Sequence, residues 1–155
     1  MEPMRTDMVI EAPRHLTWET LADLEGVSRW NPAVDAAECI SEQRQGLGAR
    51  RQCYMHPSGW MVESVIEWEP EQVIAFAIEN APPIRTGLGR FVLSENDAGT
   101  RLQASFDYEI RFGPLGPVID RLVVHRQLSS AWNDGMSCLR RDLEEQASVH
   151  ELDAG

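Results

Sequence analysis

The sequence predicts one α+β domain, in which an antiparallel sheet of seven strands curls around a single long C-terminal helix. Two observations carry this prediction. Apolar and polar residues alternate with a period of two through about seventy residues in the middle of the chain. Apolar residues then recur every three or four positions near the C-terminus. The chain has 155 residues and is 43% hydrophobic, which suits one globular domain with one core.

The N-terminal elements are short. Residues 8–12 alternate as a strand does, and Pro13 suits the first turn of a helix that carries Trp18 on its apolar side. Gly26 ends this helix, and a second helical turn is expected to reach Trp30. Two short helices therefore separate the first strand from the second.

The central region consists of apolar alternations interrupted by turn residues. Such interruptions join neighbouring strands as hairpins, so we expect six further antiparallel strands. The turns lie at residues 45–48, 56–59, 69–71, 80–83 and 96–99.

The C-terminal region predicts one long helix. Gly113 breaks the strand pattern, and Pro117 suits a first helical position. The residues that follow a spacing of three and four predict its buried face. They are Leu115, Val118, Leu122, His125, Ser129, Trp132, Met136, Leu139 and Leu143. We expect residues 148–155 to form a flexible polar tail, and the domain to span residues 1–147.

The charge balance excludes several classes of partner. Fourteen basic and twenty-five acidic residues give a net charge of −11, which would repel nucleic acid and anionic membranes. All the basic residues are arginine, and the absence of lysine excludes Schiff-base chemistry and a Walker-type phosphate loop. The longest apolar run, Val73–Ile78, is too short to cross a membrane, and no secretory signal is expected.

The cysteines and histidines predict neither disulfides nor a metal site. Cys39, Cys53 and Cys138 are widely spaced, which favours free thiols and a cytoplasmic location. The four histidines stand apart from one another and from carboxylate clusters. We also find no glycine-rich nucleotide loop, so we expect no cofactor and no metal.

The turns predict which side of the sheet faces the core. If Met55 pairs with Trp60, then Glu63 faces Gln52 and Val65 faces Arg50. If Trp68 pairs with Val73, Glu67 shares the face of Glu63, and a pairing of Glu95 with Thr100 places Phe91 opposite Ala104. The predicted inner face then carries Ile74, Phe76, Ile78, Phe91, Leu93, Leu102, Phe106 and Tyr108.

Polar residues interrupt this apolar face. Arg50, Gln52 and Glu63 would project from the sheet toward the helix, whose stripe is interrupted by His125 and Ser129. Buried polar groups must be paired or hydrated, so these residues favour a ligand cavity over a solid core. The alternative is that Glu63 pairs with Arg50 at the sheet edge while His125 reaches solvent.

The motifs and their order resemble a known superfamily. They are Ile10-Glu11-Ala12-Pro13, Trp30-Asn31-Pro32, Gly48-Ala49-Arg50-Arg51, residues 63–70, Gly99-Thr100-Arg101-Leu102 and Phe112-Gly113-Pro114-Leu115-Gly116. Together they resemble the START/Bet v 1-like (SRPBCC) superfamily with its helix-grip fold, and within it the bacterial polyketide cyclase/dehydrase-like group. The resemblance implies an elongated cavity for a hydrophobic or amphipathic molecule, with Trp30 and Asn31 near its mouth.

Members of this superfamily have several functions. Aromatase/cyclases of this superfamily line the cavity with tryptophans and with an arginine on the fourth strand. The inward positions of that strand in this sequence are predicted to be Met61, Glu63, Val65 and Glu67. Other relatives carry lipids and hormones or assist chaperones.

We expect the cavity to bind a small hydrophobic or amphipathic ligand. Trp30, Phe76, Phe91, Tyr108 and Trp132 would supply contact area, while Asn31, Arg50, Gln52, Glu63, His125 and Ser129 would orient its polar end.

An alternative is a cofactor-free cyclase or dehydratase with Glu63 as general base and His125 as general acid. A weaker alternative is an adaptor whose acidic surface binds a basic protein. The chain is also compatible with a homodimer.

Overall fold

The computed structural model describes residues 3–57, 59–81, 84–110, 113–115, 118 and 123–154. Strand β1 (Met4–Ile10) leads into helix α1 (Arg14–Ala22), a 3₁₀ turn η1 (Leu24–Gly26) and helix α2 (Val27–Trp30). The remaining strands are β2 (Val34–Cys39), β3 (Arg50–Met55), β4 (Trp60–Glu69), β5 (Val73–Asn80), β6 (Ile84–Asn96) and β7 (Gly99–Ile110). A 3₁₀ turn η2 (Gly113–Leu115) and helix α4 (His125–Ala154) follow.

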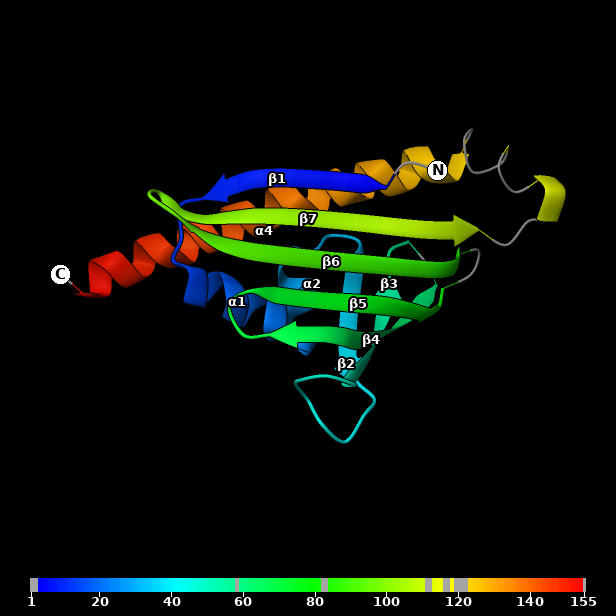
Figure 1. Ribbon diagram of the computed structural model, residues 1–155, viewed down its shortest axis with the longest axis horizontal. Coiled ribbons are helices and arrows are strands. Elements are labelled where there is room, and N and C mark those ends of the chain that lie inside the picture. The colour runs from blue at the N-terminus through cyan, green and yellow to red at the C-terminus, as the bar shows by residue number, and fades with distance from the viewer. Residues whose placement is uncertain are drawn as a thin grey trace.

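The strands form one seven-stranded sheet in the order β1-β7-β6-β5-β4-β3-β2, and every pairing is antiparallel. Strand β1 returns to pair with β7, so the first and last strands of the chain lie side by side. The sheet curls, and α4 runs along its inner side with α1 and α2 on the same side (Figure 1). This arrangement confirms the predicted fold.

The core lies between the inner side of the sheet and the middle of α4. Leu139 and Leu143 of α4 are fully buried, as are Ile74 of β5 and Leu102 of β7. Helix α4 has 30 residues, and at 1.5 Å per residue it extends for about 45 Å. Its middle turns pack against the sheet, the turns before them line a cavity, and its last turns, with Val149 and Leu152, are exposed.

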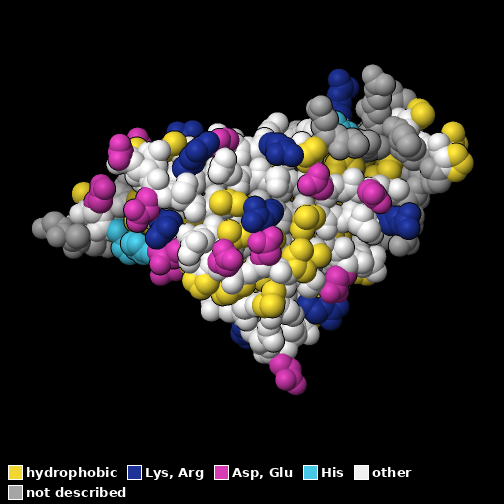
Figure 2. All heavy atoms as spheres, in the orientation of Figure 1, with side chains coloured by type: hydrophobic (Ala, Val, Ile, Leu, Met, Phe, Trp, Pro, Cys, Tyr) yellow, Lys and Arg dark blue, Asp and Glu magenta, His cyan; other side chains and the backbone are white. Residues whose placement is uncertain are grey.

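The outer side of the sheet is solvated and charged. Arginines pair there with carboxylates on other strands, as in Arg50 with Glu79 and Arg90 with Glu67. Figure 2 shows basic (dark blue) and acidic (magenta) side chains interspersed with hydrophobic ones (yellow) over this face. Exposed pairs of this kind each contribute about 0–1 kcal/mol.

The predicted C-terminal helix differs at both ends. Leu115 and Val118, expected on its buried face, are 65% and 56% exposed, and Leu122 lies outside the described residues. The regular helix begins at His125 and continues to Ala154, so the expected tail is helical. The physical reason is composition, because residues 136–154 contain no glycine or proline that would end the helix.

The β3–β4 hairpin corrects the predicted register. Tyr54 rather than Met55 pairs with Trp60, because the Met55 N–H donates to the Gly59 carbonyl at 2.9 Å and lengthens the turn by one residue. Arg51 therefore lies opposite Glu63. A shift of one residue exchanges the two faces of a strand, so Arg50 and Gln52 lie on the outer side.

Strand β4 contains a second departure from the predicted register. A bulge between Val65 and Glu67 shifts its pairing with β5, so that Glu67 lies opposite Ala75 and Trp68 opposite Ile74. Glu67 therefore lies on the outer side, contrary to the prediction, while the Trp68 ring contacts Trp18 with centroids 5.0 Å apart. The pairing of Glu95 with Thr100 and of Phe91 with Ala104 is confirmed.

We expect Gly99→Ala to destabilise the fold more than Gly46→Ala. Both glycines have positive φ, 148° and 90°, which disfavours a side chain. A Cβ at Gly99 would lie 2.3 Å from the Ile10 carbonyl oxygen, whereas one at Gly46 meets nothing within 4 Å. Gly46→Ala should lower the free energy of unfolding by about 1 kcal/mol, and Gly99→Ala should lower it further. Equal midpoints of unfolding in guanidinium chloride would contradict this packing at the end of β1.

Candidate functional site

A cavity of about 340 Å³ lies between the inner side of the sheet and helix α4. Its size falls at the lower end of the range for small-molecule sites. The sheet wall carries the rings of Phe76, Phe91 and Phe106, from β5, β6 and β7. Phe76 and Phe91 meet edge to face with centroids 6.5 Å apart. This wall is apolar because the inward positions of three neighbouring strands are aromatic.

A glycine leaves space between these rings. Gly89 of β6 pairs with Phe76 of β5 on one side and with Phe106 of β7 on the other. All three residues line the cavity, and a Cβ at Gly89 would come no closer than 3.8 Å to Phe106. A larger side chain at this position would therefore occupy the cavity itself.

Helix α4 supplies the opposite wall. Its lining positions include Leu128, Ala131, Trp132 and Gly135, which follow the spacing of one helix face. The Trp132 ring stacks near both Phe91 and Phe106, at centroid distances of 6.3 and 6.2 Å. Its Nε1 donates to the Thr6 hydroxyl at 2.8 Å, which fixes the ring against β1.

A buried ion pair forms the polar part of the lining. Arg51 of β3 and Glu63 of β4 are 6% and 9% exposed, and Arg51 Nε donates to Glu63 Oε1 at 3.2 Å. Arg51 Nη1 donates to the Leu24 carbonyl at 3.2 Å, and the guanidinium lies over the Phe76 ring, 4.3 Å from its centroid. Among the described residues that line the cavity, Arg51 and Glu63 are the charged ones.

Cys53 lies beside this pair. Its Sγ is 3.7 Å from Glu63 Oε1. The pKa of the Cys53 thiol is raised to about 12, mainly by burial, with Glu63 contributing to the rise and Arg51 opposing it. The thiol is therefore neutral at pH 7, and the charges of Arg51 and Glu63 balance each other.

Trp30 and Asn31 also line the cavity. Trp30 is only 8% exposed, and its Nε1 has no hydrogen-bond partner in the part of the chain that the structure describes. Asn31 Oδ1 accepts from the Ala33 N–H at 3.0 Å. The opening is marked by the exposed lining residues Gly59, Trp60 and Gln127.

Several predicted site residues lie elsewhere. Arg50 and Gln52 are on the outer side, where Arg50 Nη2 donates to Glu79 Oε2 at 2.6 Å. Tyr108, His125 and Ser129 are not among the described lining residues and form a separate cluster. His125 Nδ1 is 3.0 Å from the Tyr108 hydroxyl, and its Nε2 is 3.4 Å from the Ser129 hydroxyl.

The structure thus divides the predicted set into two groups. It brings together Trp30, Asn31, Glu63, Phe76, Phe91 and Trp132 around the cavity. Sequence reasoning missed Arg51, Gly89 and Phe106 as lining residues, although it placed Phe106 on the inner face. Arg51 follows Arg50 directly, and only the length of the 55–59 turn decides which of the two faces inward.

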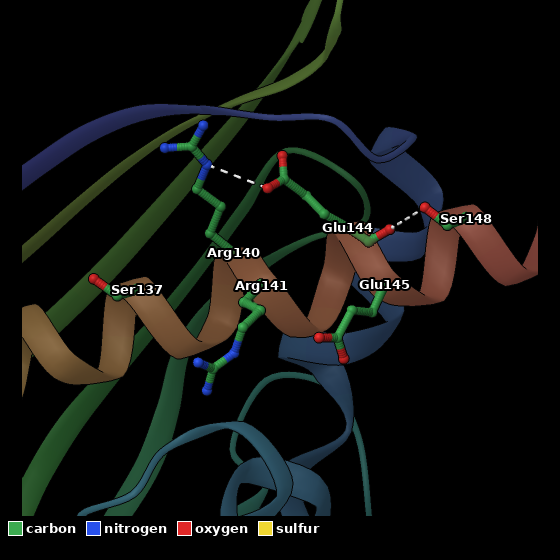
Figure 3. A pocket seen from close by; sticks show the side chains of 6 residues that line it. All are labelled: Ser137, Arg140, Arg141, Glu144, Glu145 and Ser148. Carbon is green, nitrogen blue, oxygen red and sulfur yellow. Dashed lines mark hydrogen bonds and ion pairs between the residues drawn. The ribbon is translucent and has the colours of Figure 1, made fainter.

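Two further depressions lie outside this cavity. One is on the solvent side of α4, where Arg140 pairs with Glu144 at 3.5 Å and Ser148 donates to the Glu144 carbonyl (Figure 3). Its side chains all come from α4, with Arg140 and Glu144 on one side of the helix and Arg141 and Glu145 on the other, and Glu144 Oε2 also accepts from the Glu11 N–H at 3.0 Å. The other lies near Pro13 and the β6–β7 turn, and carboxylates dominate its charged lining.

Metal and membrane signals are absent from the described part of the chain. No group of three or more histidine, cysteine or acidic side chains is placed to hold a metal ion there. No helix among the described residues has the length and hydropathy needed to cross a membrane.

We expect the Arg51–Glu63 pair to show strong energetic coupling. Arg51→Gln and Glu63→Gln should each lower the free energy of unfolding by about 3–5 kcal/mol, because each substitution leaves the partner residue charged and buried. The double variant should cost clearly less than their sum. Chemical unfolding of the three variants measures this cycle, and additive losses would contradict the pairing.

Cys53 should resist thiol reagents in the native protein. Its raised pKa keeps it protonated at pH 8, and the thiolate is the reactive form. Cys39 and Cys138 are partly exposed and should react first. Labelling with Ellman's reagent and peptide mapping measures the order, and rapid native modification of Cys53 would contradict its burial.

Solved structures resemble this chain throughout its length. The ZhuI aromatase/cyclase from Streptomyces sp. R1128 matches with a TM-score of 0.80 at 21% identity, over 94% of both chains. TTHA0849 from Thermus thermophilus matches with a TM-score of 0.78 at 19% identity, over 94% of this chain and 99% of that one. A START superfamily protein from Mycobacterium smegmatis matches with a TM-score of 0.71 at 15% identity, over 95% and 97%. These likenesses show the fold.

The sequence itself identifies the family. A search of curated proteins gives no match. The family model described as polyketide cyclase/dehydrase and lipid transport matches residues 1–144, nearly the whole chain. The chain belongs to the polyketide cyclase/dehydrase and lipid transport family.

Proposed function

We propose that this protein binds one small apolar molecule in the cavity between the sheet and α4. The observation that carries the proposal is the cavity lining. It combines a wall of aromatic rings with solvent-exposed lining residues, among them Trp60 and Gln127. Apolar surface transferred from water to such a wall contributes about 25 cal/mol per Å².

The size and stiffness of the cavity support the same proposal. A volume of about 340 Å³ corresponds to about eleven molecules of liquid water. Phe91, Phe106 and Trp132 hold one another in place, and Trp132 is also fixed to Thr6. A wall that is already ordered loses little conformational entropy when a ligand binds.

Ligand binding is favoured here over acid–base catalysis. Glu63 lines the cavity, but its Oε1 already accepts from Arg51. His125, the expected acid, contacts Tyr108 and Ser129 and is not among the described lining residues. A general acid and base must both reach the reacting molecule. No observation places these two residues on the same ligand.

We expect the neutral fluorescent probe N-phenyl-1-naphthylamine to bind saturably at one site. Trp30, Trp60 and Trp132 line the cavity, so their emission should decrease as energy transfers to the probe. Fluorescence titration measures the stoichiometry. A linear, non-saturating rise in probe emission would contradict the proposal.

Gly89→Leu should reduce this binding at least about tenfold by occupying the cavity. The matched control is Thr86→Leu, which adds leucine to the same strand at an exposed position. Circular dichroism should show that both variants fold. Equal probe affinity in the two variants would show that the probe binds elsewhere.

A further inference from the structure

We infer that the cavity selects a neutral ligand with a hydroxyl group, an apolar alcohol or phenol, and discriminates against fatty-acid anions and amines. The inference rests on the proposed function and specifies its ligand. It follows from the way in which Arg51 and Glu63 satisfy each other's charge inside the cavity while leaving hydrogen-bonding capacity toward it.

The polar part of the cavity lining carries no net charge. Arg51 and Glu63 are almost fully buried and their atoms approach to 3.2 Å, so the pair carries no net charge. The neighbouring Cys53 thiol is neutral because burial raises its pKa to about 12. A carboxylate or ammonium group entering this place would bring an unbalanced charge into an apolar enclosure, which is strongly unfavourable.

The ion pair has hydrogen-bonding groups that its own contacts leave unused. Arg51 and Cys53 both contact Glu63 Oε1, and within the described residues no donor is recorded at Oε2. Oε2 is also not one of the fully buried side-chain atoms that lack a hydrogen-bond partner. It is therefore open to a donor from the cavity. Arg51 has five N–H donors. The one on Nε is used by Glu63 and one on Nη1 by Leu24, and Nη2 also lies 3.2 Å from Glu63 Oε1, which leaves one N–H on each terminal nitrogen.

A hydroxyl group matches both of these partners. It donates one hydrogen bond and accepts others, so it can donate to Glu63 Oε2 while it accepts from Arg51. A carboxylate or a ketone only accepts, and an ammonium only donates. A neutral hydroxyl is therefore a small group that uses both sides of the ion pair without adding charge.

The remaining wall defines the rest of the ligand. Phe76 lies under the Arg51 guanidinium, and Phe91 and Phe106 continue the apolar wall across the sheet. A ligand bound by its hydroxyl at Arg51 and Glu63 would therefore place an aliphatic or aromatic body along these rings. This separation of one polar end from an apolar body gives the cavity a preferred ligand orientation.

Calorimetric titration with 1-octanol, octanoate and octylammonium at pH 7.5 tests the inference on the wild-type protein. The three probes share one chain and differ in head group, and at this pH the last two are ionised. We expect 1-octanol to bind at least about tenfold more tightly than either ion. Octanoate or octylammonium binding as tightly as 1-octanol would overturn the inference.

Glu63→Gln provides the charge-specific variant. It leaves the Arg51 cation without its carboxylate, so octanoate should bind at least about tenfold more tightly than to wild type. The matched control is Glu79→Gln, which removes the same charge from the Arg50 pair on the outer side. Octanoate affinity that stays unchanged in Glu63→Gln, or rises equally in both variants, would overturn the inference.

These measurements separate the two claims. If N-phenyl-1-naphthylamine saturates its site but the ions bind as well as the alcohol, the cavity binds ligands and the head-group selection is wrong. If neither this probe nor any octyl compound binds, the proposed function fails, and the inference fails with it. The wild-type order of the head groups decides the question even if Glu63→Gln does not fold.

Discussion

The buried pair of Arg51 and Glu63 is the constraint on which the rest of the site depends. Each charge is tolerated inside because the other neutralises it, and because the Leu24 carbonyl and the Phe76 ring engage the guanidinium. The pair also joins β3 to β4 across their inner side and contacts the turn before α2. It therefore links the register of the sheet to the polarity of the cavity.

The cavity stays open because small residues occupy positions where large ones would fill it. Gly89 leaves a gap between the rings of Phe76 and Phe106, and Ala131 and Gly135 of α4 line the opposite wall. Further along α4, Leu139 and Leu143 close the space completely against the sheet. One helix thus packs into a solid core with its middle turns and forms a cavity wall with the turns before them.

The sequence was sufficient to predict the fold and four of the five expected apolar contact residues, but not every inward position. Period-two alternation placed Phe91 correctly, and its expected pairing with Ala104 is found. Phe76 also lies opposite Val65 as expected, because the bulge after Val65 offsets a turn at 70–72 that is one residue shorter than predicted. The misplacement of Arg50 and Glu67 has a common cause: a five-residue turn at 55–59 and a bulge after Val65 change strand parity. The turn length and the bulge depend on backbone hydrogen bonds that residue types do not reveal. His125 follows the helical stripe, yet helix position alone cannot show that it meets Tyr108 beside the cavity.

The most direct test of this account is a crystal structure of the protein with 8-bromo-1-octanol, in which anomalous scattering locates the bromine. The account predicts the hydroxyl within hydrogen-bond distance of Glu63 Oε2 and Arg51, and the bromine toward the opening at Trp60 and Gln127. A ligand with its bromine end at Glu63, or bound outside the cavity, would contradict it.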